Sequence, residues 1–231
     1  MNVILIVIQV FVLLFAITVH EAAHGWAAKK CGDATAFSLG RVTLNPLAHI
    51  DPFGTVIVPL LLSISGLPVF GWAKPVPVDP RNFRNPKRDT VWTSFAGPGS
   101  NLCVAFGAMV VLVLMKLSLP SVDLFLKGRL RGMFGDVETI LGGGFRPLEG
   151  LAFILLMTVL INSYFAVFNL IPVPPLDGSG ILIGLLPEHL SVKIQRIPPI
   201  AGFLVILLLI NFHLLDIIVR MIFFPIVMIL G

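Results

Sequence analysis

The sequence predicts an all-α polytopic membrane protein, with about five to six transmembrane helices and a re-entrant or membrane-associated segment that carries a small β element. Of the 231 residues, 57% are hydrophobic and only 12% are charged, and the mean hydropathy is +0.99. These values lie far outside the range of soluble domains. Since no repeat or low-complexity tract divides the chain, we expect residues 1–231 to form a single integral membrane domain.

Four stretches are long and apolar enough to cross a bilayer. They cover residues 2–28, 91–119, 148–170 and 198–230. One span needs about 20 apolar residues, so the last stretch is too long for a single ordinary crossing. Polar residues at 211–216 would divide it into two short spans.

The run 53–70 is also apolar, but Pro59, Gly66 and Pro68 interrupt it. Basic residues flank it on both sides, and one crossing cannot place both of its ends on the same side of a membrane. We therefore expect a re-entrant or surface-lying segment, which is tolerated at membrane depth where protein covers its backbone. The alternative is a full span, which would invert the orientation of everything downstream.

The charge distribution predicts the orientation of the chain. No charge precedes Glu21, whereas Lys29, Lys30 and Arg41 follow the first span. The positive-inside tendency puts the N-terminus outside and the polar end of the first span near the cytoplasm, in a bacterial-type plasma membrane. A cleaved secretory signal is the alternative for this span, but it has no basic n-region. The net charge of +4 comes from basic residues that flank apolar spans, so no nucleic-acid partner is expected.

The first span ends in the sequence HEAAH, in which His20 and His24 are four residues apart. Positions i and i+4 share one face of a helix, so two imidazoles can bind one metal ion while Glu21 lies beside them. A catalytic zinc ion needs a third protein ligand and an open position for water, whose pKa it lowers to about 7. Glu21 would then take the proton of this water and hand it to the leaving amine.

A chance match to this short pattern is the alternative explanation for HEAAH. Ionisable residues in an apolar span are costly, and they are rare unless they are paired, face a watery cavity or bind an ion. His20 lies roughly 25 Å along the helix from Val3, near the cytoplasmic edge, where this cost is smaller. Three ionisable groups within five residues still favour an ion site.

The third ligand should be an acid or a histidine at the same depth on another helix. Asp177 follows the span 148–170 in a segment where three prolines prevent a regular helix, and the Asp-Gly pair with Gly178 suits a turn. Alternatively, Asp177 is an ordinary loop residue, or it caps a helix that begins near Ile181. The weaker candidates lie in loops, at a helix start or at a break between spans: His49, Asp51, Asp79, His189 and His213.

The two cysteines, Cys31 and Cys103, lie in different segments and lack any metal-type spacing. We expect both to be packing residues and predict no disulfide framework.

Two motifs together make the chain similar to the site-2 protease family of intramembrane zinc metalloproteases. The first is HEAAH, and the second is Asn-x-x-Pro-x-Pro-x-Leu-Asp-Gly at 169–178, with every specified position filled. The segments AGPGSN at 96–101 and GWAKPVPV at 71–78 also resemble parts of that family, and the resemblance covers about residues 10–180. The chain differs from larger members in having no room for a PDZ or CBS domain.

This resemblance implies a ligand set and a set of roles. His20, His24 and Asp177 would hold one zinc ion, Glu21 would act as the general base, and Asn169 would position substrate or stabilise an oxyanion. For Asn101, a hydrogen bond across a close helix contact is favoured over a functional role. The catalytic core would cover about residues 2–180, with the C-terminal transmembrane helices at about 198–230.

The predicted function is an intramembrane zinc metalloendopeptidase that hydrolyses peptide bonds within or near transmembrane segments of membrane-anchored substrates. Its partners would be such a segment and the lipid bilayer. A substrate helix must unwind to expose its backbone, and residues 71–78 could then pair with it as an edge strand; alternatively, they form a proline-rich surface loop. The alternatives are a metal transporter that uses the same cluster, although related halves are missing, and an inactive homologue that serves as a scaffold.

Overall fold

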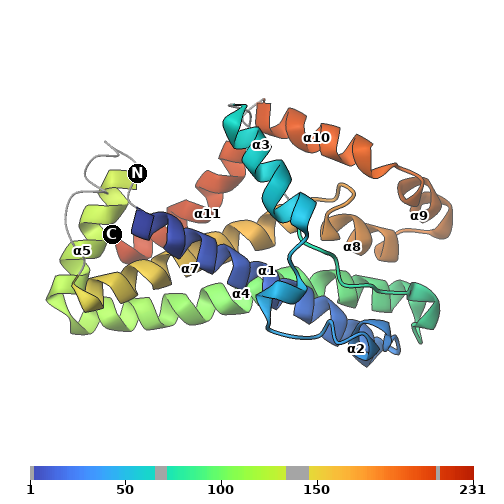
Figure 1. The fold of residues 1–231 in the computed structure, drawn as a ribbon, viewed down its shortest axis with the longest axis horizontal. Helices are drawn as coiled ribbons and strands as arrows, with labels where there is room; N and C mark the ends of the chain where they lie inside the picture. The colour runs from blue at the N-terminus through green and yellow to red at the C-terminus, as the bar shows by residue number, and fades with distance from the viewer. Residues whose placement is uncertain (1–2, 66–71, 134–145, 212–213) are drawn as a thin grey trace.

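The computed structural model describes residues 3–65, 72–133, 146–211 and 214–231, and every regular element in these ranges is a helix (Figure 1). This result confirms the predicted all-α class for the described part of the chain. The longer helices are α1 (Val3–Cys31), α4 (Pro86–Ser118), α5 (Pro120–Met133), α7 (Pro147–Asn169), α10 (Pro199–Asn211) and α11 (Leu214–Leu230). The shorter ones are α2 (Thr35–Ser38), α3 (Val58–Ile64), α8 (Asp177–Leu185) and α9 (Glu188–Gln195). Short 3₁₀ or π turns cover Pro46–Ala48, Pro52–Ile57 and Pro80–Asn82.

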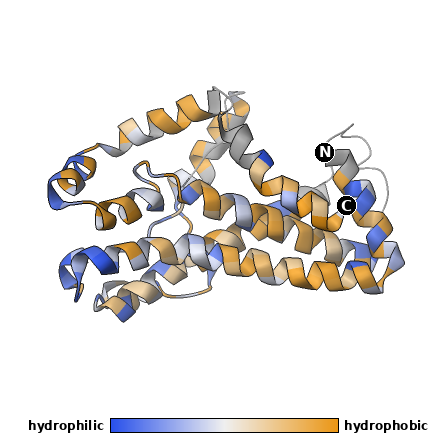
Figure 2. Cartoon of the chain, turned by 180° about the vertical axis from the view of Figure 1, so that it is seen from behind, coloured by the Kyte–Doolittle hydropathy of each residue, from blue (hydrophilic) through white to orange (hydrophobic). Residues whose placement is uncertain are grey.

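Helices α1, α4 and α7 pack against one another, and α4 runs in the opposite direction to the other two (Figure 1). Their core, together with α5 and α11, includes the fully buried Leu112, Leu126 and Leu156. Apolar residues continue along these helices on the outside as well (Figure 2), where Phe11 and Phe106 are exposed. An apolar core with an apolar exterior is what a lipid environment favours.

Three of these helices are long and apolar enough to cross a membrane: α1, α4 and α7. They confirm the predicted stretches 2–28, 91–119 and 148–170. Helices α10 and α11 have 13 and 17 residues, or about 20 and 26 Å at 1.5 Å per residue, which is shorter than a hydrocarbon core of roughly 30 Å. The predicted count of five to six spans is therefore not confirmed, and part of the predicted break, residues 212–213, lies outside the described residues.

The start of the apolar run 53–70 lies against Trp72, the first described residue after the run. The Trp72 N–H group donates to the carbonyl of Gly54 at 3.0 Å, and Thr55 Oγ1 donates to the carbonyl of Trp72 at 2.9 Å. Helix α3 lies between Thr55 and Trp72 in the chain, and residues 66–71 are outside the described part. A single crossing would separate its ends by the thickness of the membrane, so this contact fits a re-entrant segment better than a full span.

The β element predicted at 71–78 is not confirmed, because the described residues, which include 72–78, contain no strand. The backbone N–H groups of this segment have irregular partners instead. Lys74 N–H donates to the carbonyl of His49 at 2.9 Å, and Val76 N–H donates to Glu21 Oε2 at 2.8 Å. Since Pro75 and Pro77 carry no N–H group, few donors remain for a neighbouring strand.

Asp33 joins the end of α1 to the loop that follows this segment. Its fully buried carboxylate accepts hydrogen bonds from Thr35 N, Asp79 N and Asn82 Nδ2. Burial by itself would raise the pKa of this carboxyl, but the hydrogen bonds, with that from the Thr35 hydroxyl among the strongest, outweigh it and lower the pKa to about 2. Charged Asp33 therefore holds the loop 79–82 against α1.

We expect the protein to lose stability as the pH falls from about 4 to about 2. An unfolded Asp has a pKa of about 3.9, so the lower folded value means that Asp33 contributes stability above that pH and loses it as the pH falls through its folded pKa. Asp33→Asn should cost about 2 kcal/mol at pH 7 and flatten the dependence. Thermal unfolding in detergent between pH 7 and pH 2 measures both effects. An equal dependence of stability on pH in the variant and in wild type would contradict this role of Asp33.

Candidate metal centre

His20 and His24 lie one turn apart on α1, and their Nε2 atoms are 3.0 Å apart. The other ring nitrogens are each tied to a residue of α4. His20 Nδ1 lies 2.7 Å from Asn101 Oδ1, and His24 Nδ1 lies 2.7 Å from the carbonyl of Thr93. Both partners only accept, so both Nδ1 atoms carry the hydrogen. The two Nε2 atoms are therefore left with lone pairs directed at the same point.

Asp177 brings a third acceptor to this point. Its Oδ2 atom is 3.0 Å from His20 Nε2 and 3.3 Å from His24 Nε2. Neither nitrogen has a hydrogen to donate, and this buried oxygen has no other hydrogen-bond donor among the described residues. With both rings neutral, three acceptors that face one another without a donor repel, and either a bound cation or a proton between them relieves this repulsion.

The spacing of these three atoms fits zinc. A tetrahedral ion with ligand bonds of about 2.0 Å has ligands separated by about 3.3 Å, close to the observed 3.0–3.3 Å. Two imidazole nitrogens and one carboxylate oxygen are also a ligand set that zinc accepts in catalytic sites, with a fourth position open. The residues present therefore fit the ion, and the cluster His20, His24 and Asp177 could hold it.

Gly97 of α4 leaves the space that such an ion needs. A Cβ atom at this position would collide with His24 Nε2 and would lie 2.7 Å from His20 Nε2. No side chain other than hydrogen fits this close approach of the helix to both imidazoles. The AGPGSN segment thus has a geometric reason for glycine at this position.

The proline-rich turn between α7 and α8 positions Asp177 next to the two histidines. Residues 170–176 form no helix, as their prolines predict, and α8 begins at Asp177 rather than near Ile181. Gly178 is required by a close backbone contact, because a Cβ atom there would collide with the carbonyl oxygen of Leu170. The turn therefore folds back onto the end of α7 and places the carboxylate over the histidines.

Glu21 lies beside the three acceptors but on a different side of α1. Its Oε2 atom accepts the hydrogen bond from Val76 N–H at 2.8 Å. This contact ties the carboxylate to the irregular segment 72–79, which the sequence did not predict. Glu21 is thus oriented by a backbone donor, next to an ion site rather than within it.

Asn101 has a larger part in the site than the predicted packing role. It is fully buried, and besides holding His20 it donates from Nδ2 to the carbonyl of Ala16 at 3.0 Å and to Asn162 Oδ1 at 2.9 Å. Asn162 is itself fully buried on α7 and donates to the carbonyl of Thr158. The predicted bond across a helix contact exists, but it orients an imidazole. Sequence reasoning missed Asn162, for which the signal was an amide in the middle of an apolar span.

None of the other candidates belongs to the group of potential metal ligands found among the described residues. Asn169 donates from Nδ2 to the carbonyl of Phe165, one turn earlier in its own helix. Its role in positioning substrate or stabilising an oxyanion stays a prediction. His49 is buried and bonded to the carbonyl of Thr43. Asp51 and Asp79 cap the short turns that follow them. His189 lies exposed on α9, and His213 is outside the described residues.

We expect Asn101→Ala to weaken zinc binding about 10- to 100-fold, the usual cost of removing a residue that orients a histidine ligand. The His20 ring would lose its acceptor and could rotate or change tautomer. Asn162→Ala should have the same effect on a smaller scale, because it removes only a support of Asn101. Competition with a fluorescent zinc chelator measures both affinities. A larger loss of zinc affinity in Asn162→Ala than in Asn101→Ala would contradict the inference that Asn162 acts through Asn101.

Comparison with known proteins places the chain among membrane zinc metalloproteases. Residues 8–209 match the model of Peptidase family M50, and the chain belongs to this family, that of the site-2 proteases. The resemblance predicted from the two motifs is thereby confirmed, as is the assignment to the metalloproteases.

Among its relatives, the chain is 38% identical over 200 residues to a Bacillus subtilis (strain 168) protein named "Putative zinc metalloprotease YwhC", which covers 87% of this chain and 78% of the relative. It is 28% identical over 211 residues to Rip2 of Mycolicibacterium smegmatis, which carries the same description, covering 87% of this chain and 68% of the relative. No solved structure matches the chain. These names do not favour the metal transporter alternative.

Proposed function

We propose that this chain is an intramembrane endopeptidase that hydrolyses peptide bonds within or near transmembrane segments of membrane-anchored proteins. The observation that carries the proposal is the convergence of three acceptor atoms, from His20, His24 and Asp177, where two long apolar helices meet a proline-rich turn. A hydrolytic ion site at this place is within reach of a substrate that lies in the bilayer.

In this proposal His20, His24 and Asp177 hold the zinc ion. When bound, the ion supplies Lewis acidity, which polarises the scissile carbonyl and lowers the pKa of water. Asn101 and the Thr93 carbonyl keep both Nε2 atoms unprotonated and directed at the ion. Because Gly97 has no side chain, the space next to both Nε2 atoms stays free for the ion.

Glu21 is the proton carrier of the reaction. Its carboxylate takes a proton from the attacking water and returns it to the nitrogen of the leaving amine. The hydrogen bond from Val76 N–H to Oε2 holds the side chain in one orientation, and the other oxygen, Oε1, is the atom assigned to the proton. Asn169 remains a candidate for contact with the substrate carbonyl.

The substrate segment would lie extended beside residues 72–79. These residues form no helix or strand, and the N–H groups of Trp72, Lys74 and Val76 already have partners in the protein. A substrate strand on the other side would donate to carbonyl groups of this segment. The basic residues at the end of α1 and before α4 support a site toward the cytoplasmic face of a bacterial-type plasma membrane.

The experiment is cleavage of a model transmembrane protein by the purified chain in detergent, before and after removal of zinc. We expect a strong zinc chelator to abolish cleavage and one equivalent of Zn²⁺ to restore it. Mg²⁺ and Ca²⁺ should fail, because they prefer sites made only of oxygen ligands. Full cleavage by a preparation shown to contain no metal would overturn the proposal.

A further inference from the structure

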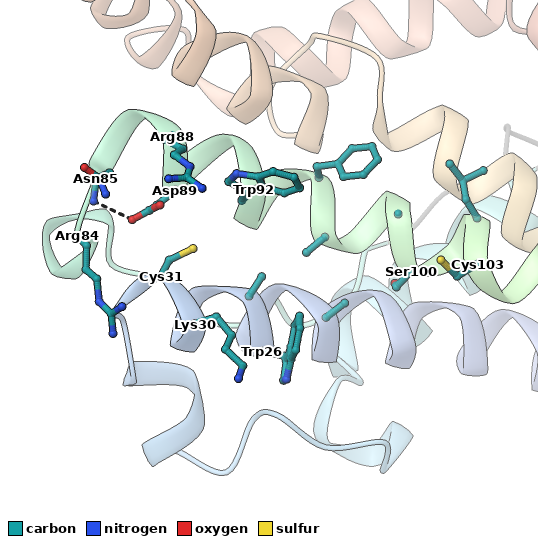
Figure 3. Close-up of a pocket in the computed structure, with 16 residues that line it drawn as sticks. Trp26, Lys30, Cys31, Arg84, Asn85, Arg88, Asp89, Trp92, Ser100 and Cys103 are labelled. Atoms are coloured by element: carbon teal, nitrogen blue, oxygen red, sulfur yellow. Dashed lines mark hydrogen bonds between the residues drawn. The ribbon is translucent and has the colours of Figure 1, made fainter.

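A groove of about 870 Å³ lies between α1 and α4, apart from the metal centre (Figure 3). None of His20, Glu21, His24 and Asp177 lines it. One end is polar, and its lining includes Lys30, Arg84 and Arg88; the other end reaches Ser100 and Cys103 (Figure 3). The groove therefore joins a cationic end to a wall that lies along two membrane-spanning helices.

The cationic end carries an excess of positive charge. Lys30, Arg84 and Arg88 are exposed, and none of them forms an ion pair within the described residues. Asp89 is the one acid among the lining residues, and it is buried and accepts a hydrogen bond from Asn85 N–H at 2.8 Å. Three cations against one acid leave a net charge of +2 at this end.

Most of the remaining lining residues are apolar and typical of a membrane protein. Trp26 and Trp92 flank the groove, one on each helix, and are 58% and 55% exposed. Half-exposed tryptophans next to basic residues are typical of the level at which lipid headgroups meet the hydrocarbon. Phe95 and Leu102 continue the wall along α4, and both are exposed as well.

The length of the apolar part matches one leaflet. From Trp92 to Cys103, α4 rises by about 16 Å at 1.5 Å per residue, and half of a hydrocarbon core of roughly 30 Å is about 15 Å. A free phosphate would use only the cationic end. A substrate helix that follows the positive-inside tendency would bring Lys or Arg to this level and would be repelled by Lys30, Arg84 and Arg88.

We propose that this groove binds an anionic phospholipid, with the phosphate between Lys30, Arg84 and Arg88 and an acyl chain along Trp92, Phe95 and Leu102. Basic pockets between membrane helices suit such headgroups. Because Lys30 follows His24 by less than two helical turns, the lipid would also fix the depth of the metal site in the bilayer. This consequence rests on the proposed function, whereas the binding itself does not.

The test measures quenching of tryptophan fluorescence by phospholipids with brominated acyl chains. The chain has three tryptophans, so Trp72→Phe leaves only Trp26 and Trp92, both in the groove. In mixed micelles, brominated phosphatidylglycerol should quench at about tenfold lower mole fraction than brominated phosphatidylcholine. The triple variant Lys30→Gln, Arg84→Gln, Arg88→Gln should lose this preference.

The matched control changes three basic residues of the same regions that do not line the groove: Lys29→Gln, Arg81→Gln and Lys87→Gln. It alters the net charge equally and should keep the preference. Equal quenching by the two lipids in Trp72→Phe would overturn the proposal, and so would loss of the preference in the control, which would mean a general surface charge effect. Relief of quenching by soluble glycerol phosphate would indicate a free phosphate site, and relief by a transmembrane substrate peptide would indicate a substrate groove; either result would overturn the lipid assignment.

Two further measurements keep the result decisive. Native mass spectrometry of the unaltered chain, released from a mixture of both lipids, should show retained phosphatidylglycerol in preference to phosphatidylcholine. If it shows no preference, the proposal fails regardless of how the variants fold. Zinc content and cleavage are measured on the same samples, so that failure of the lipid site is distinguished from failure of the protease.

Discussion

Glu21→Gln is expected to abolish peptide-bond cleavage while leaving bound zinc in place. The amide cannot take a proton from water, and loss of a general base typically costs 10²- to 10⁴-fold in rate. Its oxygen can still accept the hydrogen bond from Val76 N–H, so the segment 72–79 should remain where it is. The three acceptor atoms of the metal centre belong to other residues and are unchanged.

The measurement compares cleavage of a transmembrane substrate and zinc content per chain in this variant and in wild type. Glu188→Gln is the matched control, because it makes the same chemical change at an exposed position on α9. It should retain full cleavage. Cleavage by Glu21→Gln at the wild-type rate would refute Glu21 as the proton carrier, and loss of zinc together with activity would instead assign it to the ligand set.

Gly97→Ala is expected to lose both zinc and activity, although the added group is only a methyl. That methyl would lie against the Nε2 atoms of His20 and His24, at the place where the proposed ion would sit. Either the imidazoles turn away and break their bonds to Asn101 and Thr93, or α4 moves away from α1. Both outcomes spread the ligand atoms, and we expect zinc affinity to fall by at least about 100-fold.

Gly107→Ala is the control for this variant, since it lies on the same helix and its Cβ atom would meet no heavy atom within 4 Å. It should bind zinc normally and be at least as stable as wild type, because alanine favours a helix over glycine by about 1 kcal/mol. Zinc titration of the two variants measures whether only Gly97→Ala loses affinity for the ion. Normal zinc affinity in Gly97→Ala would show that the ion does not occupy the space between the histidines and α4.

Much of the metal centre could be predicted from the sequence because its chemistry is local. The spacing of His20 and His24 fixes their common helix face, and the cost of ionisable groups in an apolar span makes an ion site the favoured explanation. The prolines before Asp177 predicted an interrupted helix, and the structure has one at 170–176. These inferences needed no knowledge of how the helices pack.

The features that sequence reasoning missed depend on packing between distant segments. The role of Gly97 follows only from the approach of α4 to α1, and that of Asn162 from its place opposite Asn101. The segment 71–78 was expected to contain a β element. Its described backbone N–H groups instead donate to the carbonyls of Gly54 and His49 and to the Glu21 carboxylate. The count of spans depended on the C-terminal helices α10 and α11. Their hydrophobicity is clear from the sequence, but their described lengths of 13 and 17 residues are short for an ordinary crossing.

Zinc-edge X-ray absorption of the purified protein tests the central claim most directly, because it reports which atoms surround the ion. With His20, His24 and Asp177 as ligands, the spectrum should show two imidazole rings and further oxygen donors at about 2.0–2.2 Å. Sulfur at about 2.3 Å, the distance of a cysteine ligand, or a single imidazole would contradict the assignment of these three residues.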